Sequence, residues 1–318
     1  MFAQLPNYQP ADPKLWQGRE DTINERIFQN IRFLSSEQEL LNKGKKTILI
    51  GFASDEGVIR NQGRPGAQLG PDAIKSQLAK LPCPKAVELI DLGLIRCENH
   101  DLEVAQKQFA DIISFCQNQK HLTIGLGGGH EIAWAHYQGL APHYPKLGII
   151  NFDAHFDLRP YAPGDLGTSG TPFSQIAADC ANQQRPFHYC CLGIQQFGNT
   201  PSLFQRAKEL QVPYLSAEQM IQQEQSTQLA FLDEFIKKVD HLYLTICLDV
   251  LAESVAPGVS APQTLGLTPW QILPLLKHII KTGKVVSFDI AELSPPLDQD
   301  KKTARLAALI IAELLDIN

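Results

Sequence analysis

The sequence predicts an α/β fold built on an open, mostly parallel sheet of about eight strands with helices on both faces. Short apolar segments rich in β-branched residues alternate along the chain with longer segments whose apolar residues recur at helical spacing. The apolar segments are nearly continuous, which is typical of strands buried on both faces of a parallel sheet. A closed barrel also uses about eight such strands, and we favour the open sheet over it.

Eight segments combine apolar and β-branched residues over the length of a strand and are therefore predicted as strands. They are KTILIGF (46–52), AVELIDL (86–92), HLTIGLG (121–127), KLGIINF (146–152), HYCCLGI (188–194), VPYLS (212–216), HLYLTICLDV (241–250) and KVVSFDIAEL (284–293). The segments between them carry apolar residues three and four positions apart, which predicts helices. These helices cover residues 71–81, 101–117, 131–140, 228–239, 269–281 and 303–315.

The chain of 318 residues contains no linker-like stretch, internal repeat or low-complexity tract. We therefore expect one domain over residues 1–318. Within it, residues 1–44 are expected to form an N-terminal extension packed on the domain, with a helical segment near residues 21–34.

Composition and charge argue against several classes of protein. A net charge of −6, with no block rich in Lys or Arg, argues against a nucleic-acid partner. No apolar run is long enough for a membrane span, and the first residues lack the basic and apolar regions of a signal peptide. The seven cysteines form no CxxC pair and are odd in number, which favours a reduced, cytoplasmic protein.

Asp153, His155 and Asp157 occupy every second position of NFDAHFD, directly after the expected strand at 146–152. Because residues two apart on a strand point the same way, the three polar groups leave the end of a buried strand together. Unpaired buried charges are very costly, and a bound cation would compensate them. The alternative is a surface turn in which Asp153 caps a helix and His155 is solvated. The surface turn is disfavoured, because a strand that comes from the core seldom continues directly into a solvated turn.

Three further polar clusters lie at expected strand ends, where open parallel sheets bind ligands. In GLGGGHE, the glycines let the backbone pass close to a bound group before His130. In TICLDVLAESVAPGVSAP, Cys247 and Asp249 alternate at the end of an apolar strand, so that both face one way. The last strand delivers Glu292 to its end. Taken singly, His130 could be a helix-terminal residue without a ligand, and Glu292 a helix cap or a solvated carboxylate.

The clusters together offer more ligands than one metal ion needs. They supply two imidazoles and three carboxylates, from His130, Asp153, His155, Asp157 and Asp249, with Cys247 as a candidate sixth ligand. A single catalytic zinc usually takes three or four protein ligands, so two adjacent ions are favoured. Mixed oxygen and imidazole ligands suit hard ions such as Mn²⁺. Two such ions would turn water into a hydroxide nucleophile near neutral pH, which indicates metal-assisted hydrolysis.

The four clusters resemble the signature of the ureohydrolase superfamily, which includes arginase, agmatinase and formimidoylglutamase. That signature is a GG[GD]H turn, a DAHxD strand end, an SxDxD-like strand end followed by APG, and a late glutamate. Here it takes the form GGGH (127–130), DAHFD (153–157), TICLDVLAESVAPG (245–258) and DIAEL (289–293), in the same order and within about residues 45–316. The resemblance implies an arginase-like α/β/α sandwich and a binuclear Mn²⁺ centre that hydrolyses a C–N bond at an amidine or guanidine carbon.

Within the superfamily, the chain is most similar to the formimidoylglutamase branch. The similarity lies in GFASDEGVIRNQGRPGAQLGPDAIK (51–75), TSGTPFSQI (168–176) and GIQQFGNTPSLFQRA (193–207). Arginases and agmatinases carry a histidine where this chain has Ser169. The resemblance therefore implies hydrolysis of N-formimidoyl-L-glutamate to L-glutamate and formamide, a step of histidine degradation. An arginase- or agmatinase-like enzyme acting on a guanidine is the alternative.

The family's metal ligands can be carried over by matching position. His130, Asp153 and Asp157 would hold one ion, and Asp153, His155 and Asp249 would hold the other, with Asp153 as a bridge. Members of the superfamily are commonly trimers or hexamers, so a homo-oligomer is expected.

The same matching implies roles in catalysis and substrate binding. Asp157 would act as a general acid toward the departing amine, and Glu292 would pair with the cationic amidinium. The substrate's two carboxylates call for basic partners, and a solvated surface charge is the alternative for each arginine. The candidate substrate-binding residues are Arg60, Asn61, Arg64, Arg159 and Asn199.

Cys247 departs from the family pattern, which has a second bridging aspartate at this position. A thiol has a reference pKa of about 8.5, and its soft sulfur favours Zn²⁺ or a similar ion over Mn²⁺. Three interpretations stay open. Cys247 bridges as a thiolate with an altered metal preference; it is not a ligand, and one ion is weakly bound or missing; or the chain is an inactive, metal-poor paralogue. A buried cysteine that acts as a small hydrophobe fits the last two.

Overall fold

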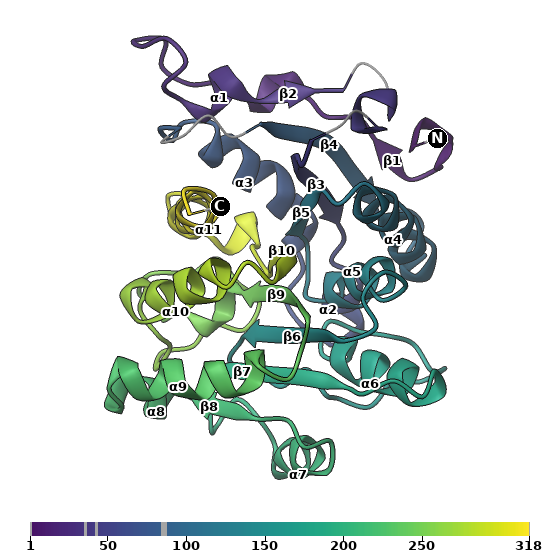
Figure 1. Cartoon of the computed structure of the whole chain (residues 1–318), viewed down its shortest axis with the longest axis vertical. Coiled ribbons are helices and arrows are strands. Elements are labelled where there is room, and N and C mark those ends of the chain that lie inside the picture. Colours follow the sequence, from purple (N-terminus) through teal and green to yellow (C-terminus); the bar gives the residue numbers. More distant parts are fainter. Residues whose placement is uncertain (1, 35–36, 42–43, 84–87, 318) are drawn as a thin grey trace.

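A ten-stranded sheet forms the middle of three layers in the computed structural model, which describes residues 2–34, 37–41, 44–83 and 88–317 (Figure 1). Its long strands are β3 (Thr47–Ala53), β4 (Leu89–Arg96), β5 (Leu122–Gly127), β6 (Leu147–Phe152), β7 (His188–Ile194), β8 (Tyr214–Ser216), β9 (His241–Cys247) and β10 (Val285–Ala291). These eight are parallel and lie in the order β4-β3-β5-β10-β9-β6-β7-β8. The prediction of an open, mostly parallel sheet is confirmed.

Helices cover both faces of the sheet and bury two separate apolar cores. The helices are α1 (Ile27–Asn30), α2 (Glu56–Arg60), α3 (Gly70–Leu78), α4 (Leu102–Asn118), α5 (Ile132–Leu140), α6 (Pro172–Asn182), α7 (Pro201–Glu209), α8 (Ala217–Gln222), α9 (Gln225–Ile236), α10 (Pro269–Lys281) and α11 (Lys302–Leu315). In Figure 1, α3, α8, α9, α10 and α11 lie on one side of the sheet, and α4, α5 and α6 on the other. Strand β3 shows how one strand serves both cores, since Leu49 packs into one and Ile48 and Ile50 into the other.

The eight expected strands and the six expected helices are present, with shifted ends. The strand expected at 86–92 runs from Leu89 to Arg96, and residues 86–87 lie outside the described residues. The strand expected at 241–250 ends at Cys247, because Leu248–Val250 tighten into a 3₁₀ turn. Sequence analysis did not anticipate helices α2, α6, α7 and α8. In the segment expected to be helical near 21–34, only Ile27–Asn30 forms a helix.

The N-terminal extension packs on the edge strand β4. Its strands β1 (Tyr8–Gln9) and β2 (Arg32–Phe33) pair with β4, antiparallel and parallel respectively. The Trp16 indole donates to Asp91 over 2.9 Å, and Asp91 also forms a fully buried ion pair with Lys75 at 2.7 Å. Among the described residues, no helix has both the length and the apolar character of a membrane span.

Candidate metal centre

Four neighbouring strands deliver the candidate ligands to one edge of the sheet. In the order β5-β10-β9-β6, the loop after β5 carries His130, β10 leads into Glu292, β9 ends at Cys247, and β6 leads into Asp153. These strands are parallel, so their carboxyl ends meet at the same edge. The structure therefore brings together residues more than a hundred positions apart in the sequence.

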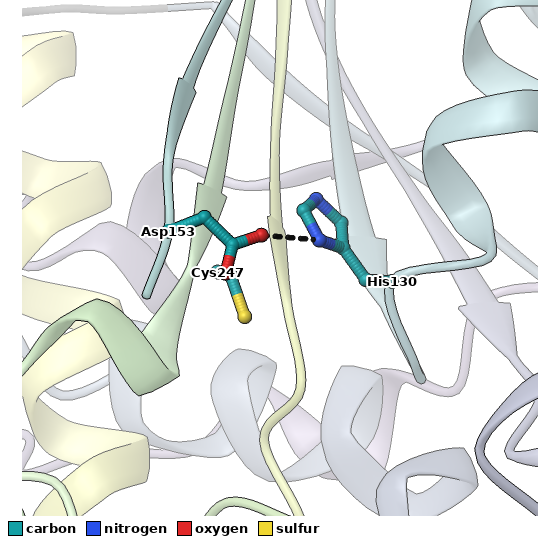
Figure 2. Close-up of side chains that lie close together, drawn as sticks. All are labelled: His130, Asp153 and Cys247. Atoms are coloured by element: carbon teal, nitrogen blue, oxygen red, sulfur yellow. Dashed lines mark ion pairs between the residues drawn. The ribbon is translucent and has the colours of Figure 1, made fainter. Parts of the chain in front are cut away.

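The first group of side chains surrounds Asp153 and the His130 ring (Figure 2). His130 Nδ1 lies 3.0 Å from Asp153 Oδ2 and 2.9 Å from Asp157 Oδ2. The ligand atoms of His130, Asp153 and Cys247 all lie within 4.8 Å of one another. Figure 2 shows the Cys247 sulfur beside the Asp153 carboxylate.

The second group shares Asp153 with the first. His155 Nδ1 lies 3.0 Å from Asp249 Oδ2 and 3.5 Å from Asp153 Oδ1, and the ligand atoms of these three residues also lie within 4.8 Å of one another. Asp249 follows the strand in the 3₁₀ turn, so this turn, and not strand alternation, directs its side chain to the site. Cys247 belongs to the first group only, and Asp249 follows it two residues later in the chain.

The pKa values of these side chains are shifted by their burial and by the closeness of the carboxylates to one another. Burial and the charge of Asp153 raise the pKa of Asp157 to about 6, and the same two causes raise the pKa of Asp249. Although burial opposes it, hydrogen bonds from His130 and His155 lower the pKa of Asp153 below its usual range. Burial and the neighbouring carboxylates raise the pKa of the Cys247 thiol well above its usual value.

These residues fit a pair of divalent cations. Three carboxylates are buried together, and two of them have raised pKa values, so positive charge between them would relieve their repulsion. The donor set is mixed nitrogen and oxygen, apart from the sulfur, and one carboxylate belongs to both groups.

Two residues of the site have positive φ angles, which are unusual for residues other than glycine. Asp157 has a φ of 49° and Glu292 a φ of 73°. Such conformations cost free energy and persist where the surrounding structure imposes them. In Glu292, the side chain turns back so that Oε1 accepts a hydrogen bond from the His130 amide over 2.8 Å. Burial raises the pKa of Glu292 to about 8, with Glu131 as the next cause.

A cavity of about 430 Å³ opens beside the ligands. It is lined by Asn61, Gln62, Gly63, Arg64, His130, His155, Asp157, Arg159, Ser169, Cys247, Asp249, Ser260, Ala261 and Glu292. The Arg64 guanidinium is held by the carbonyls of Val259 and Ser260 at 2.8 and 3.0 Å, and Asn61 donates to Ser169 over 3.3 Å. The cavity therefore has cationic and amide groups on one side and the candidate metal ligands on the other.

Two of the expected substrate-binding residues lie elsewhere. Arg60 pairs with Glu56 at 3.0 Å and with Glu103 at 2.6 Å, and it donates to the Gly167 carbonyl, so it links α2 to α4 and to the loop before Ser169. Asn199 accepts from the Phe156 amide over 3.0 Å and donates to the Ala154 carbonyl over 2.9 Å. Asn199 thus stabilises the backbone of the DAHFD loop. Neither Arg60 nor Asn199 is among the residues that line the cavity.

Sequence analysis missed residues that support the ligands. Asn151 donates to Asp153 Oδ2 over 3.0 Å, and Thr245 lies 2.9 Å from His130 Nε2. Each stands two residues before a ligand, on the same face of an otherwise apolar strand. A polar residue at that spacing was a usable signal. Gln62 and Ser260 in the cavity wall gave no comparable signal.

Comparison with known proteins identifies the family. The model of the arginase family matches residues 45–316. A formimidoylglutamase of Legionella pneumophila (strain Lens) is 66% identical over 319 residues and covers 100% of both chains, and one of Ralstonia nicotianae is 44% identical over 96% of each chain. Among solved structures, a formimidoylglutamase of Bacillus subtilis has a TM-score of 0.82 at 23% identity, covering 94% of this chain and 92% of that chain. A formiminoglutamase of Trypanosoma cruzi, solved with Mn²⁺, has a TM-score of 0.80 at 22% identity, covering 91% and 97%. The chain belongs to the arginase family and groups with its formimidoylglutamase members.

Proposed function

We propose that this chain hydrolyses N-formimidoyl-L-glutamate to L-glutamate and formamide. The observation that carries the proposal is the 66% identity to a formimidoylglutamase over the whole chain, together with the convergence of His130, Asp153, His155 and Asp249 beside one cavity. As a member of the arginase family, the chain is a hydrolase of C–N bonds. Guanidine hydrolysis and an inactive paralogue, the two alternatives, are not favoured by relatives of this kind.

The proposed cofactor is a pair of Mn²⁺ ions. His130, Asp153 and Asp157 would hold one ion, and Asp153, His155 and Asp249 the other. When bound, such a pair supplies a hydroxide nucleophile near neutral pH. The Cys247 sulfur lies within 4.8 Å of the ligand atoms of His130 and Asp153, so it could contribute a thiolate, which would raise the affinity for a softer ion such as Zn²⁺.

Asp157 and Glu292 provide the acid–base and charge-pairing chemistry. Asp157 Oδ2 is held 2.9 Å from His130 Nδ1, and Asp157 lines the cavity, where a carboxylate could take a proton from water and return it. It would carry the proton from water to the glutamate nitrogen as the C–N bond breaks. Glu292 lines the cavity and would pair with the amidinium, whose positive charge favours the ionised carboxylate.

Two arginines would recognise the substrate's two carboxylates. Arg64 is fixed by backbone carbonyls, and Arg159 lies against Gly170, at the same cavity wall as the Asn61–Ser169 pair. Bidentate pairing of a guanidinium with a carboxylate gives both affinity and orientation. We assign Arg60 and Asn199 a supporting role, since both are engaged with the protein itself.

The test is release of L-glutamate from N-formimidoyl-L-glutamate, followed with a coupled glutamate assay after loading with Mn²⁺. We expect turnover in the wild type, a loss of at least about 100-fold in Asp157→Asn, and no urea from arginine or agmatine. Urea release, or no turnover of the amidine by a chain that holds two ions, would overturn the proposal. A homo-oligomeric state and a cytoplasmic location stay predictions.

A further inference from the structure

A buried chain of hydrogen bonds leads from His130 away from the cavity. His130 Nδ1 faces Asp153 and Asp157, so Nδ1 is the nitrogen that would bind a metal ion. A ligating nitrogen cannot keep its proton, and the proton of a neutral ring is therefore on Nε2. Nε2 lies 2.9 Å from Thr245 Oγ1, which must accept this hydrogen bond.

The Thr245 hydroxyl then has to donate its own proton elsewhere. Tyr243 stands two residues earlier on the same face of β9, so its buried hydroxyl is the neighbouring group that can accept this proton. Tyr243 in turn donates to Asp289 Oδ2 on the neighbouring strand β10, where Asp289 stands opposite Thr245. A carboxylate only accepts, so Tyr243 donates to Asp289 and its own oxygen is left to accept a proton from Thr245.

A second branch reaches Asp289 from the other side. His136 Nδ1 lies 2.6 Å from Asp289 Oδ2, and His136 Nε2 lies 2.5 Å from Ser287 Oγ. Ser287 lies 2.5 Å from Thr123 Oγ1, which accepts from the Gln117 amide over 2.9 Å. Ser287 Oγ also donates to the Thr123 carbonyl over 2.9 Å, so this branch reaches Asp289 through the His136 Nδ1 contact. All of these side chains are buried, so water does not compete for their hydrogen bonds.

We propose that Tyr243 and Asp289 are positioning residues for the metal centre. Through Thr245 they hold His130 with its proton on Nε2 and its Nδ1 lone pair toward the ion, although neither contacts a ligand position directly. The inference rests on the proposed metal centre. Partners of this kind typically change metal affinity by about 10- to 100-fold when they are removed.

The test is Mn²⁺ binding by the full-length protein, followed by the electron paramagnetic resonance signal of free Mn²⁺. Tyr243→Phe removes only the hydroxyl oxygen, and Thr245→Val removes the hydroxyl at nearly constant shape. Thr245→Ser keeps the hydroxyl. The matched control is Tyr137→Phe, because the buried Tyr137 hydroxyl contacts Asp179 and Cys180, outside the chain of hydrogen bonds.

We expect about 10- to 100-fold weaker binding of one of the two ions in Tyr243→Phe and Thr245→Val. Thr245→Ser and Tyr137→Phe should bind both ions as the wild type does, whatever their melting temperatures. Unchanged affinities in Tyr243→Phe and Thr245→Val would overturn this inference alone. Equal losses in Thr245→Ser or Tyr137→Phe would also overturn it, because they would show a general packing effect. A wild type that binds no Mn²⁺ would overturn the metal centre and this inference together. Should Tyr243→Phe fail to fold, Asp289→Asn tests the same proposal, because its amide can donate to Tyr243 and no longer fixes the direction of that hydrogen bond; an unchanged Mn²⁺ affinity in Asp289→Asn would overturn the inference.

Discussion

Replacing Cys247 with aspartate tests the electrostatics of the centre most directly. The side chain is buried, and its ligand atom lies within 4.8 Å of those of His130 and Asp153. Burial and the neighbouring carboxylates raise the pKa of the thiol, so the wild type carries no charge there in the absence of a metal ion. Cys247→Asp therefore adds a negative charge beside Asp153, whose lowered pKa keeps it ionised.

The size of the effect follows from that separation. Two like unit charges 4.8 Å apart repel by about 3.5 kcal/mol at an effective dielectric constant of about 20. Protonation limits this cost, so we expect the metal-stripped variant to melt about 5 °C below the wild type. When divalent cations are bound, the added negative charge is stabilising instead of destabilising. The affinity of Cys247→Asp for Mn²⁺ should therefore be at least about tenfold higher than that of the wild type, or about 1.4 kcal/mol.

The assay is calorimetric titration of metal-stripped protein with Mn²⁺ and, separately, with Zn²⁺, with melting curves before and after loading. The matched control is Cys247→Ser, which removes the sulfur and adds no charge. It should leave the melting temperature of the metal-stripped protein within about 2 °C and should not gain Mn²⁺ affinity. If Cys247→Asp binds Mn²⁺ no more tightly than the wild type, the side chain at this position does not act on the ions, and the reasoning fails.

Three further predictions follow from the same structure. Arg159→Gln should raise KM for N-formimidoyl-L-glutamate by about 10- to 100-fold with little change in kcat, whereas an unchanged KM would remove Arg159 from the substrate site. The folded-state pKa of Glu292 is raised to about 8 from its usual value near 4.5, so the metal-stripped protein should lose stability as pH rises between these values. The melting temperature should therefore fall less steeply with pH in Glu292→Gln than in the wild type. An equal fall in both proteins would contradict the raised pKa of Glu292. Lys75→Met leaves the Asp91 carboxylate buried without its ion pair, and urea unfolding should show a loss of about 3–5 kcal/mol. A loss below about 1 kcal/mol would mean that Trp16 and the Gly93 amide satisfy Asp91 without Lys75.

The ligands could be predicted from the sequence because their signal is local. Asp153 and His155 follow a strand whose apolar character is visible in the sequence, and the ends of parallel strands meet at one edge. Which of the four clusters lie next to Asp153 depends on the strand order, so the grouping of His130 with Asp153 came from the resemblance to the family and not from the fold class. Asp249 was anticipated for a partly mistaken reason, since a 3₁₀ turn and not a strand directs its side chain.

Arg60 shows where this kind of prediction stops. Its position in the loop beside Asn61 gave it the same apparent role as Arg64. Its partners are Glu56, one turn away on a helix too short to show periodicity, and Glu103, which only the tertiary fold brings near. The short strands β1 and β2 were missed for the same reason, because two-residue strands are defined by their pairing with β4 and not by their own composition.

The charge balance of the centre explains how a cysteine can stand at position 247. In the proposed centre, Asp153, Asp157 and Asp249 would balance three of the four positive charges of two divalent ions, and a hydroxide or a thiolate would balance the fourth. An aspartate in place of Cys247 would ionise more readily than the thiol, whose pKa is raised by burial and the neighbouring carboxylates, so the cysteine would ionise only when a metal ion is close. A cysteine at this position therefore avoids a fourth buried carboxylate in the metal-stripped protein, and under the proposed function it would become a ligand when the ions bind. We therefore expect Cys247→Ser to bind Mn²⁺ more weakly than the wild type and Cys247→Asp to bind it more tightly. Serine loses the ionisable group, whereas aspartate ionises more readily than cysteine.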